Sequence, residues 1–392
     1  MQGRALRLWG GRVASDAWSA QSRDLIIREG HICRGGDGAE LDLSGYLLLP
    51  GLINAHDHLE FGLFPRLGHG PYANATEWAA DIYQPDASPV KQHLTTPKPV
   101  RLVWGGIRNL LSGVTSVAHH NPYDEATFGD RFPVRVVRQF GWAHSLKFSP
   151  DLRERFAATP AGWPFIVHAA EGVDTTARAE IRQLDAMGVL SDGTVIVHGN
   201  AAGPGEIEIL RARGCPIVWC PSSNLSTYGR TLTRETIRSG IRIALGTDSS
   251  LTAGIDLIDE IRAAKHQGDL SAEEVYDMIT SQAAAVLGLR AGEGTLREDG
   301  VADLVAVRNT GQTPAEAILD LHPELVIVGG QIRLMSQRFA DLASGFRTEH
   351  FRRIVLERRG SWWIDADVPA LLRTAADAIG PECRLAGRLV TS

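Results

Sequence analysis

Most of the information about the fold lies in the run Pro50-Gly51-Leu52-Ile53-Asn54-Ala55-His56-Asp57-His58. Its apolar part predicts a buried β-strand that ends in polar residues. Because alternate residues of a strand share a face, His56 and His58 point the same way, whereas Asp57 points the other way. The run therefore predicts two imidazoles side by side at the end of a strand, with Asp57 behind them in packing or in a hydrogen bond.

The sequence pattern changes on both sides of this run. Residues 1–50 consist of short alternating runs separated by turn clusters such as Gly10-Gly11, which predicts β-strands. From 51 to 290, apolar runs alternate with amphipathic helical stretches, as in βα units around a parallel sheet. Strand patterns return over 291–344. We therefore predict an α/β fold, a (β/α)8 TIM-type barrel with a small β-sandwich built from both chain ends, and assign residues 345–392 to a C-terminal extension without a function.

Four later apolar runs follow one another at separations that suit one βα unit each. They are Phe165–Val167, Val195–Val197, Pro216–Trp219 and Ile241–Leu245. The polar residues that follow them include His168, His198 and Asp248. In a (β/α) barrel the carboxyl ends of the strands converge on one mouth, so these residues become neighbours in space. Three imidazoles and one carboxylate form a nitrogen-rich set that suits Zn²⁺ or Fe²⁺ better than Mg²⁺ or Ca²⁺.

The same residues resemble those of amidohydrolase-superfamily enzymes, and the matches recur in order along most of the chain. The resemblance is to the branch that deaminates cyclic amidine-like rings, such as cytosine, guanine, adenosine-type and triazine deaminases. It implies one divalent metal ion, zinc with iron(II) as the alternative, held by His56, His58, His168 and Asp248. A bound ion of this kind lowers the pKa of its water to ~7 and gives a hydroxide nucleophile at neutral pH.

The resemblance also implies which residues move protons. Glu171, three residues after His168, matches the carboxylate that protonates a ring nitrogen and then the departing amine. His198 matches the histidine that polarises the substituent of the attacked carbon or stabilises the oxygen that develops there. Asp248 would orient the hydroxide and take its proton. The implied reaction is hydrolysis of a C–N bond, with deamination of a cyclic amidine or guanidine-like small molecule.

Further residues are expected to contact the substrate. The segment 220–225 resembles the strand-seven signature of the same branch. Residues near 120 and 144 line the mouth or lie on surface loops. The long segment 59–96 could fold over the site as a lid with aromatic anchors and one cation, or simply pack on the barrel rim. The predicted substrate contacts are His119, His120, Asn121, His144, Arg66, Trp78, Ser223 and Asn224.

The chain departs from the family pattern between residues 121 and 165. Two βα units should fit there, but the stretch is short for both. Strands three and four are therefore expected to be compressed, or one helix to be lost, which would leave the pocket open on that side.

Composition narrows the partners of the protein. The 392 residues carry a net charge of -6 at pH 7 and no basic cluster interleaved with aromatics, so nucleic acid is not expected as a partner. No apolar run has the length of a signal peptide or a membrane span, so a cytoplasmic location without membrane contact is expected. The four cysteines are too few and too spread for a disulfide framework. A small molecule is the expected substrate, and a homodimer stays open as one arrangement.

Two other functions also stay open. The first is hydrolysis of a cyclic or linear amide by two metal ions bridged by a carboxylated lysine, for which Lys147 is the candidate. Glu171 argues for one metal ion instead, since its carboxylate marks the mononuclear branch. The second is a non-catalytic scaffold, which is disfavoured because no ligand has been lost.

Overall fold

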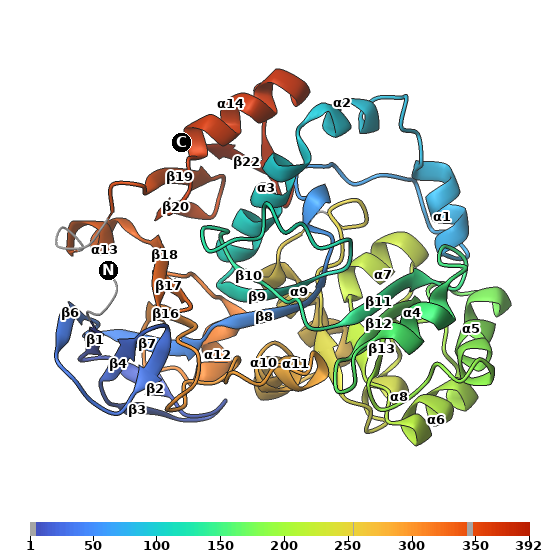
Figure 1. Cartoon of the computed structure of the whole chain (residues 1–392), viewed down its shortest axis with the longest axis horizontal. Coiled ribbons are helices and arrows are strands. Elements are labelled where there is room, and N and C mark those ends of the chain that lie inside the picture. The colour runs from blue at the N-terminus through green and yellow to red at the C-terminus, as the bar shows by residue number, and fades with distance from the viewer. Residues whose placement is uncertain (1–4, 254, 343–347) are drawn as a thin grey trace.

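The computed structural model describes residues 5–253, 255–342 and 348–392. Figure 1 shows helices packed around parallel strands, with antiparallel strands from both chain ends beside them. The predicted α/β class is confirmed. The predicted boundary at residue 344 lies outside the described residues.

Parallel strands form two sheets in chain order. One contains β8 (Leu52–Asp57), β9 (Val114–His119) and β10 (Arg135–Val136). The other contains β11 (Gly141–Ser145), β12 (Phe165–Ala169), β13 (Thr194–His198), β14 (Ile217–Trp219) and β15 (Ile243–Leu245). Asp248, just after β15, forms a parallel bridge with Asp57, and its N–H donates to the carbonyl of His56 at 3.1 Å. Gly246 allows this approach, because a Cβ there would lie 2.7 Å from the His56 Cβ.

Helices follow most of these strands. The larger ones are α3 (Lys98–Leu110), α5 (Thr175–Ala186), α6 (Pro204–Arg213), α7 (Pro221–Tyr228) and α9 (Leu257–Gly268). The shorter ones are α4 (Leu152–Ala158), α8 (Arg234–Ile237), α10 (Ala272–Met278), α11 (Ser281–Val286) and α12 (Pro314–Leu319). Side chains at the amino ends fix where several begin: Ser271 and Glu274 form a capping box at α10. Within the part of the chain that the structure describes, no helix is both long and apolar enough to cross a membrane.

The stretch between residues 121 and 165 is compressed, as the sequence predicts. β10 is two residues long and continues into β11 through residues 137–140 without a helix between them. Helix α4 then connects β11 to β12. This fully described stretch therefore has no helix after β9 and none after β10.

Antiparallel strands from both chain ends share one long sheet, as expected from the patterns over 1–50 and 291–344. β7 (Tyr46–Pro50) pairs with β16 (Leu304–Arg308), with Pro50 opposite Leu304. The sheet also contains β2 (Arg12–Ala14), β3 (Ala20–Ser22), β17 (Leu325–Val328) and β18 (Gln331–Met335). A smaller sheet holds β1 (Ala5–Trp9), β4 (Leu25–Arg28), β5 (His31–Cys33) and β6 (Gly38–Asp42). Residues of both sheets, among them Leu8 and Leu325, belong to one buried apolar cluster.

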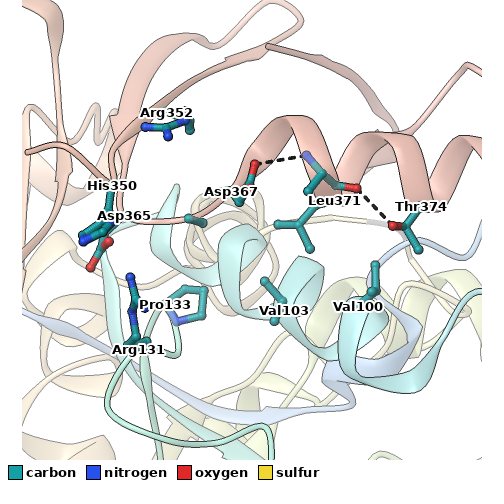
Figure 2. A pocket seen from close by; sticks show the side chains of 12 residues that line it. Val100, Val103, Arg131, Pro133, His350, Arg352, Asp365, Asp367, Leu371 and Thr374 are labelled. Carbon is teal, nitrogen blue, oxygen red and sulfur yellow. Dashed lines mark hydrogen bonds between the residues drawn. The ribbon is translucent and has the colours of Figure 1, made fainter.

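The C-terminal extension continues the long sheet and adds a helix over the parallel part. Its elements are β19 (Arg352–Leu356), β20 (Gly360–Ile364), α14 (Val368–Ile379), β21 (Arg384–Leu385) and β22 (Arg388–Thr391). They follow α13 (Gln337–Leu342). Helix α14 lies against α3 and leaves a surface pocket of about 510 Å³, lined by Val103 and Leu371 with Arg131 and His350 at its edge (Figure 2). No predicted site residue lines this pocket.

Candidate metal centre and active site

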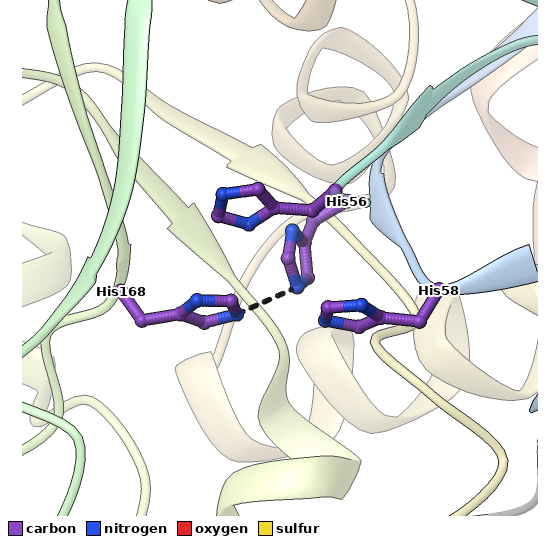
Figure 3. Close-up of side chains that lie close together, drawn as sticks. His56, His58 and His168 are labelled. Atoms are coloured by element: carbon purple, nitrogen blue, oxygen red, sulfur yellow. Dashed lines mark hydrogen bonds between the residues drawn. The ribbon is translucent and has the colours of Figure 1, made fainter. Parts of the chain in front are cut away.

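Three histidines from the ends of two strands converge on one buried point (Figure 3). His56 and His58 come from the end of β8 and His168 comes from β12. The Nε2 atoms of His56 and His168 lie 3.2 Å apart. Asp248 Oδ1 lies 3.6 Å from Nε2 of both His56 and His58. The structure thus brings together the four residues expected as metal ligands.

The histidine nitrogens that face away from this point are held by oxygen acceptors. His58 Nδ1 lies 2.6 Å from Asn121 Oδ1, and His168 Nδ1 lies 2.8 Å from the carbonyl oxygen of His144. Each ring can donate its Nδ1–H outward and keep the Nε2 lone pair for an ion, as metal-bound histidines do. Asn121 and His144, expected as substrate contacts, therefore orient two of the histidines here.

Burial and neighbouring charges set the protonation states of this cluster. Burial lowers the pKa of His56 to about 3 and that of His168 well below its usual range, so both rings are neutral at pH 7. Burial by itself would raise the pKa of Asp248, but the hydrogen bond with His56 and the charge of His198 bring it below its usual range. Neutral imidazoles and an ionised carboxylate are the forms that bind metal ions. Since His56 Nδ1 is also buried without a hydrogen-bond partner among the described residues, the donor set fits a divalent ion.

Glu171 and His198 form a pair beside the histidine cluster. Glu171 Oε1 lies 3.6 Å from His198 Nε2 and accepts a hydrogen bond from the Tyr228 hydroxyl at 2.6 Å. His198 Nδ1 lies 2.8 Å from Asn224 Oδ1, so Nε2 is its inward nitrogen. His198 also has a φ of 73°, a left-handed conformation that non-glycine residues adopt mainly where the surroundings enforce it. Glu171 and His198 are thus both held in place by side chains of their surroundings.

Helix α7 contacts three of the residues expected to be catalytic. Besides the contacts of Asn224 and Tyr228, Ser223 Oγ donates to Asp248 Oδ2 at 2.6 Å. Ser223 and Asn224, expected as substrate contacts, thus hydrogen-bond to other site residues. Tyr228 was not expected, although it lies four residues after Asn224 and therefore on the same helix face.

Asp57 lies behind the two histidines of its strand, as expected. It is fully buried and accepts hydrogen bonds from Arg108 Nη2 at 2.6 Å and from Asn109 Nδ2 at 2.7 Å. Arg108 also donates to Ser250 Oγ at 2.8 Å. The buried ion pair therefore ties β8 to α3 and to the loop that carries Asp248.

Glu260, a residue of α9, contacts the amino end of α7. Its Oε1 accepts the Ser222 N–H at 3.0 Å, while Oε2 is buried without a hydrogen-bond partner among the described residues. Burial raises the pKa of Glu260 from 4.5 to about 8. An ionised carboxylate at this place would leave one charged oxygen unsolvated, so the neutral form is preferred.

We expect Glu260→Gln to flatten the dependence of stability on pH. Because the folded chain keeps this proton and the unfolded chain loses it above pH 4.5, the stabilisation is complete below that pH and is lost as the pH rises towards about 8. The loss amounts to about 5 kcal/mol. Urea unfolding between about pH 5 and pH 8 should therefore show a smaller decline for Glu260→Gln than for the parent. If the stability of Glu260→Gln fell with pH as steeply as that of the parent, this expectation would be wrong. As a control, Glu154→Gln changes an exposed carboxyl group and should show the same decline as the parent.

The neighbouring histidines after β9 differ in position. His119 Nδ1 accepts the N–H of Leu59 at 3.2 Å, and its ring packs against Phe128. The structure thus does not bring His119 into the cluster. His120 points the other way, and its ring centroid lies 4.5 Å from that of His168.

The 59–96 segment contacts the loops that follow β12 and β15 and the end of α7. It contains the 3-10 turn at Leu59–Phe61, α1 (Ala75–Ile82) and α2 (Val90–Thr95). Its backbone N–H groups donate to the carbonyl oxygens of Glu171 and of α7, and exposed Arg66 donates to the Ser226 carbonyl at 3.0 Å. Trp78 is half-buried in α1, with no hydrogen-bond partner for its Nε1 among the described residues.

Lys147 does not lie in the histidine cluster. It is exposed in the turn after β11, whereas the histidines of the cluster are buried. The structure therefore offers no support for a lysine bridge between two ions.

Buried neutral imidazoles with an ionised carboxylate, next to a carboxyl group that can move protons, are typical of metal-dependent hydrolases. The sequence model described as "Amidohydrolase family" matches residues 138–333, half of the 392 residues. The chain therefore belongs to the amidohydrolase family and is a hydrolase of carbon–nitrogen bonds other than peptide bonds.

Relatives and solved structures agree with this family. A curated relative, the 5-methylthioadenosine/S-adenosylhomocysteine deaminase of Natronomonas pharaonis, is 27% identical over 415 residues, covering 87% of this chain and 95% of the relative. The crystal structure of a zinc-bound adenosine deaminase from Xanthomonas campestris covers 95% of this chain and 97% of its own, with 18% identity and a TM-score of 0.73. An atrazine chlorohydrolase from Arthrobacter aurescens TC1, crystallised with zinc and atraton, covers 95% and 100%, with 20% identity and a TM-score of 0.73. Because both identities are at or below 20%, these solved structures support the fold of this chain and nothing more about it.

Proposed function

We propose that the protein deaminates a small molecule in which an amino group is attached to an amidine-type carbon of a ring, and releases ammonia. The observation that carries this proposal is Glu171, which lies between Tyr228 and His198 beside the metal-binding histidines. A buried carboxyl group at that place can give a proton to a ring nitrogen and later to the amine. The named activity of the Natronomonas relative, on adenosine derivatives, supports a ring amine of the aminopurine kind.

We further propose that His56, His58, His168 and Asp248 hold one ion, zinc with iron(II) as the alternative. When bound, such an ion lowers the pKa of a water molecule to ~7 and so supplies hydroxide at neutral pH. The nitrogen-rich donor set favours these metals over magnesium or calcium. The zinc in the structures of similar fold supports the same choice.

The proton steps would be carried by side chains of this chain. Asp248, fixed by Ser223, accepts the proton that the attacking water gives up. Glu171 delivers its proton to the ring nitrogen, takes up the remaining proton of the attacking oxygen once that oxygen is bonded to carbon, and passes this proton to the leaving amine. His198, with Nδ1 held by Asn224, presents Nε2 to the oxygen that forms on the attacked carbon.

The two parallel sheets, we infer, are parts of one eight-stranded barrel. One buried apolar cluster contains residues from both, including Ile53, Ile166, Val195, Val218 and Ala244. Side chains shared in this way are expected of a barrel interior. By the same reasoning, the shared cluster of the two antiparallel sheets supports a β-sandwich, with the barrel spanning residues 51–290.

A screen of pooled heterocyclic amines and amides, with products identified by mass, tests the proposed function. Deamination would replace an amino group with oxygen and release ammonia, whereas amide hydrolysis would open a ring or split the molecule. Deaminated products from ring amines would support the proposal. Products from the amides alone would overturn it and favour the amide hydrolase.

Arg66→Ala should raise KM for the substrate and leave kcat and metal content unchanged. The exposed hydrogen bond from Arg66 to the Ser226 carbonyl ties the 59–96 segment to α7. Since such a bond contributes ~1 kcal/mol, a three- to tenfold rise in KM is expected if this segment closes over the substrate. Steady-state kinetics with equal metal loading provide the measurement. A KM equal to that of the parent would show that the contact is only structural.

A further inference from the structure

His120 stands inside the cluster of metal-binding histidines, although the family pattern of four ligands does not include it. It follows β9, and its ring centroid lies 4.5 Å from that of His168 and 5.0 Å from that of His56. It is 1% exposed. One ring nitrogen each of His56, His58, His120 and His168 lie within 4.8 Å of one another. His120 therefore belongs to the same group of close imidazoles as the three histidines whose positions match the family.

The hydrogen bonds of His120 repeat the arrangement seen at the other histidines. Its Nε2 lies 3.1 Å from the carbonyl oxygen of Ala143. The next residue, His144, holds His168 with its own carbonyl oxygen. The Nδ1 of His120 is buried and has no hydrogen-bond partner among the described residues. If Nε2–H donates to the carbonyl, the lone pair of the buried Nδ1 is left free. A ring anchored on one nitrogen with the other free and enclosed is what a metal-bound histidine shows.

A role as substrate contact fits this environment less well. The free nitrogen is buried in a ring that packs against other imidazoles, and a buried polar atom without a partner costs free energy unless something binds it. Nitrogen ligands at ~2.1 Å from one ion lie up to ~4.2 Å apart, so small side-chain shifts would bring these rings into one coordination sphere.

We propose that His120 is an additional ligand, so that four imidazoles and Asp248 hold the ion. The inference deepens the proposed function, because it concerns the same metal centre. His120 binds through Nδ1, whereas His58 and His168 bind through Nε2. A donor set of this size leaves less room for further ligands than the four-residue pattern does, and it holds the ion more tightly.

The test uses cobalt(II)-loaded protein and counts ligands by NMR. Each coordinated histidine keeps one N–H, whose signal is shifted strongly by cobalt, so the parent should show four such signals and His120→Ala three. Competition with a chelator should show at least a tenfold lower metal affinity for His120→Ala. The matched control is His144→Ala. The ring of His144 also lies close to that of His168, at 4.8 Å between centroids, but His144 holds His168 through its backbone carbonyl, which alanine keeps. His144→Ala should keep all four signals and the parental affinity.

Three signals in the parent, or parental affinity in His120→Ala, would overturn the inference. The signal count of the parent decides the question even if His120→Ala does not fold. The outcome is separable from the proposed function. If the parent shows four signals but deaminates no ring amine, His120 is a ligand and the deaminase function is wrong. If the parent deaminates a ring amine but shows three signals, the deaminase function stands and His120 is not a ligand.

Discussion

Asp248→Ala is expected to lose the metal ion and the activity together. Asp248 Oδ1 lies 3.6 Å from Nε2 of both His56 and His58, and its ionised carboxylate is the only negative charge in the proposed ligand set. Without it, the remaining imidazoles would hold a divalent cation without charge compensation. The metal content of the purified variant, measured by elemental analysis, should therefore fall from about one equivalent to background. His168→Ala should behave in the same way.

Ser223→Ala provides a graded comparison for the loss of Asp248. It removes the 2.6 Å hydrogen bond to Asp248 Oδ2 and leaves the carboxylate itself in place. Loss of a partner that orients a ligand typically costs ~10- to 100-fold in metal affinity. Ser223→Ala should therefore bind metal weakly, and an excess of zinc should restore its occupancy. Full metal content in Asp248→Ala would contradict the assignment of Asp248 as a ligand.

Glu171→Gln is expected to lower turnover by ~10² or more while metal content remains unchanged, because general acid and base catalysis contributes this much. Glutamine keeps the shape of the side chain and can still accept the hydrogen bond from Tyr228, but it cannot exchange a proton. Substrate binding should survive. Steady-state ammonia release at equal metal occupancy is the measurement.

Glu180→Gln is the matched control for Glu171→Gln. Glu180 is a half-buried carboxyl group on α5 that accepts the N–H of Ala170 at 2.8 Å, a bond that the glutamine oxygen can also accept. This variant should keep the parental rate, since the hydrogen bond from the Ala170 N–H survives the change. Near-parental turnover in Glu171→Gln would remove Glu171 from the mechanism, and with it the main structural reason for preferring deamination.

The convergence of the proposed metal ligands could be predicted because each of these residues follows a local pattern. An apolar run that ends in a polar residue marks the carboxyl end of a strand, and alternation along β8 separates His56 and His58 from Asp57. The pairing of both chain ends in one sheet could also be expected from the apolar runs. No such pattern indicates that β19 and β20 extend that sheet, because strand pairing at a sheet edge depends on distant contacts.

Which of two adjacent histidines enters the site could not be predicted. The pairing of β8 with β9 is irregular between Asn54 and Asp57, so counting alternate residues does not decide between His119 and His120. The contacts of α7 were missed for a different reason. Its strand-seven signature indicates a functional helix, but only the angle at which the helix packs places Ser223 on Asp248 and Tyr228 on Glu171.

Ammonia release by metal-loaded protein in ¹⁸O-labelled water tests the central claim most directly. With aminopurine nucleosides as substrates, we predict one ammonia for each product molecule and ¹⁸O on the carbon that lost the amine. Removal of the metal by a chelator should stop both, and zinc should restore them. If the metal-loaded protein released no ammonia from any ring amine but incorporated ¹⁸O into the carboxylate of an opened cyclic amide, the proposed deaminase function would be wrong.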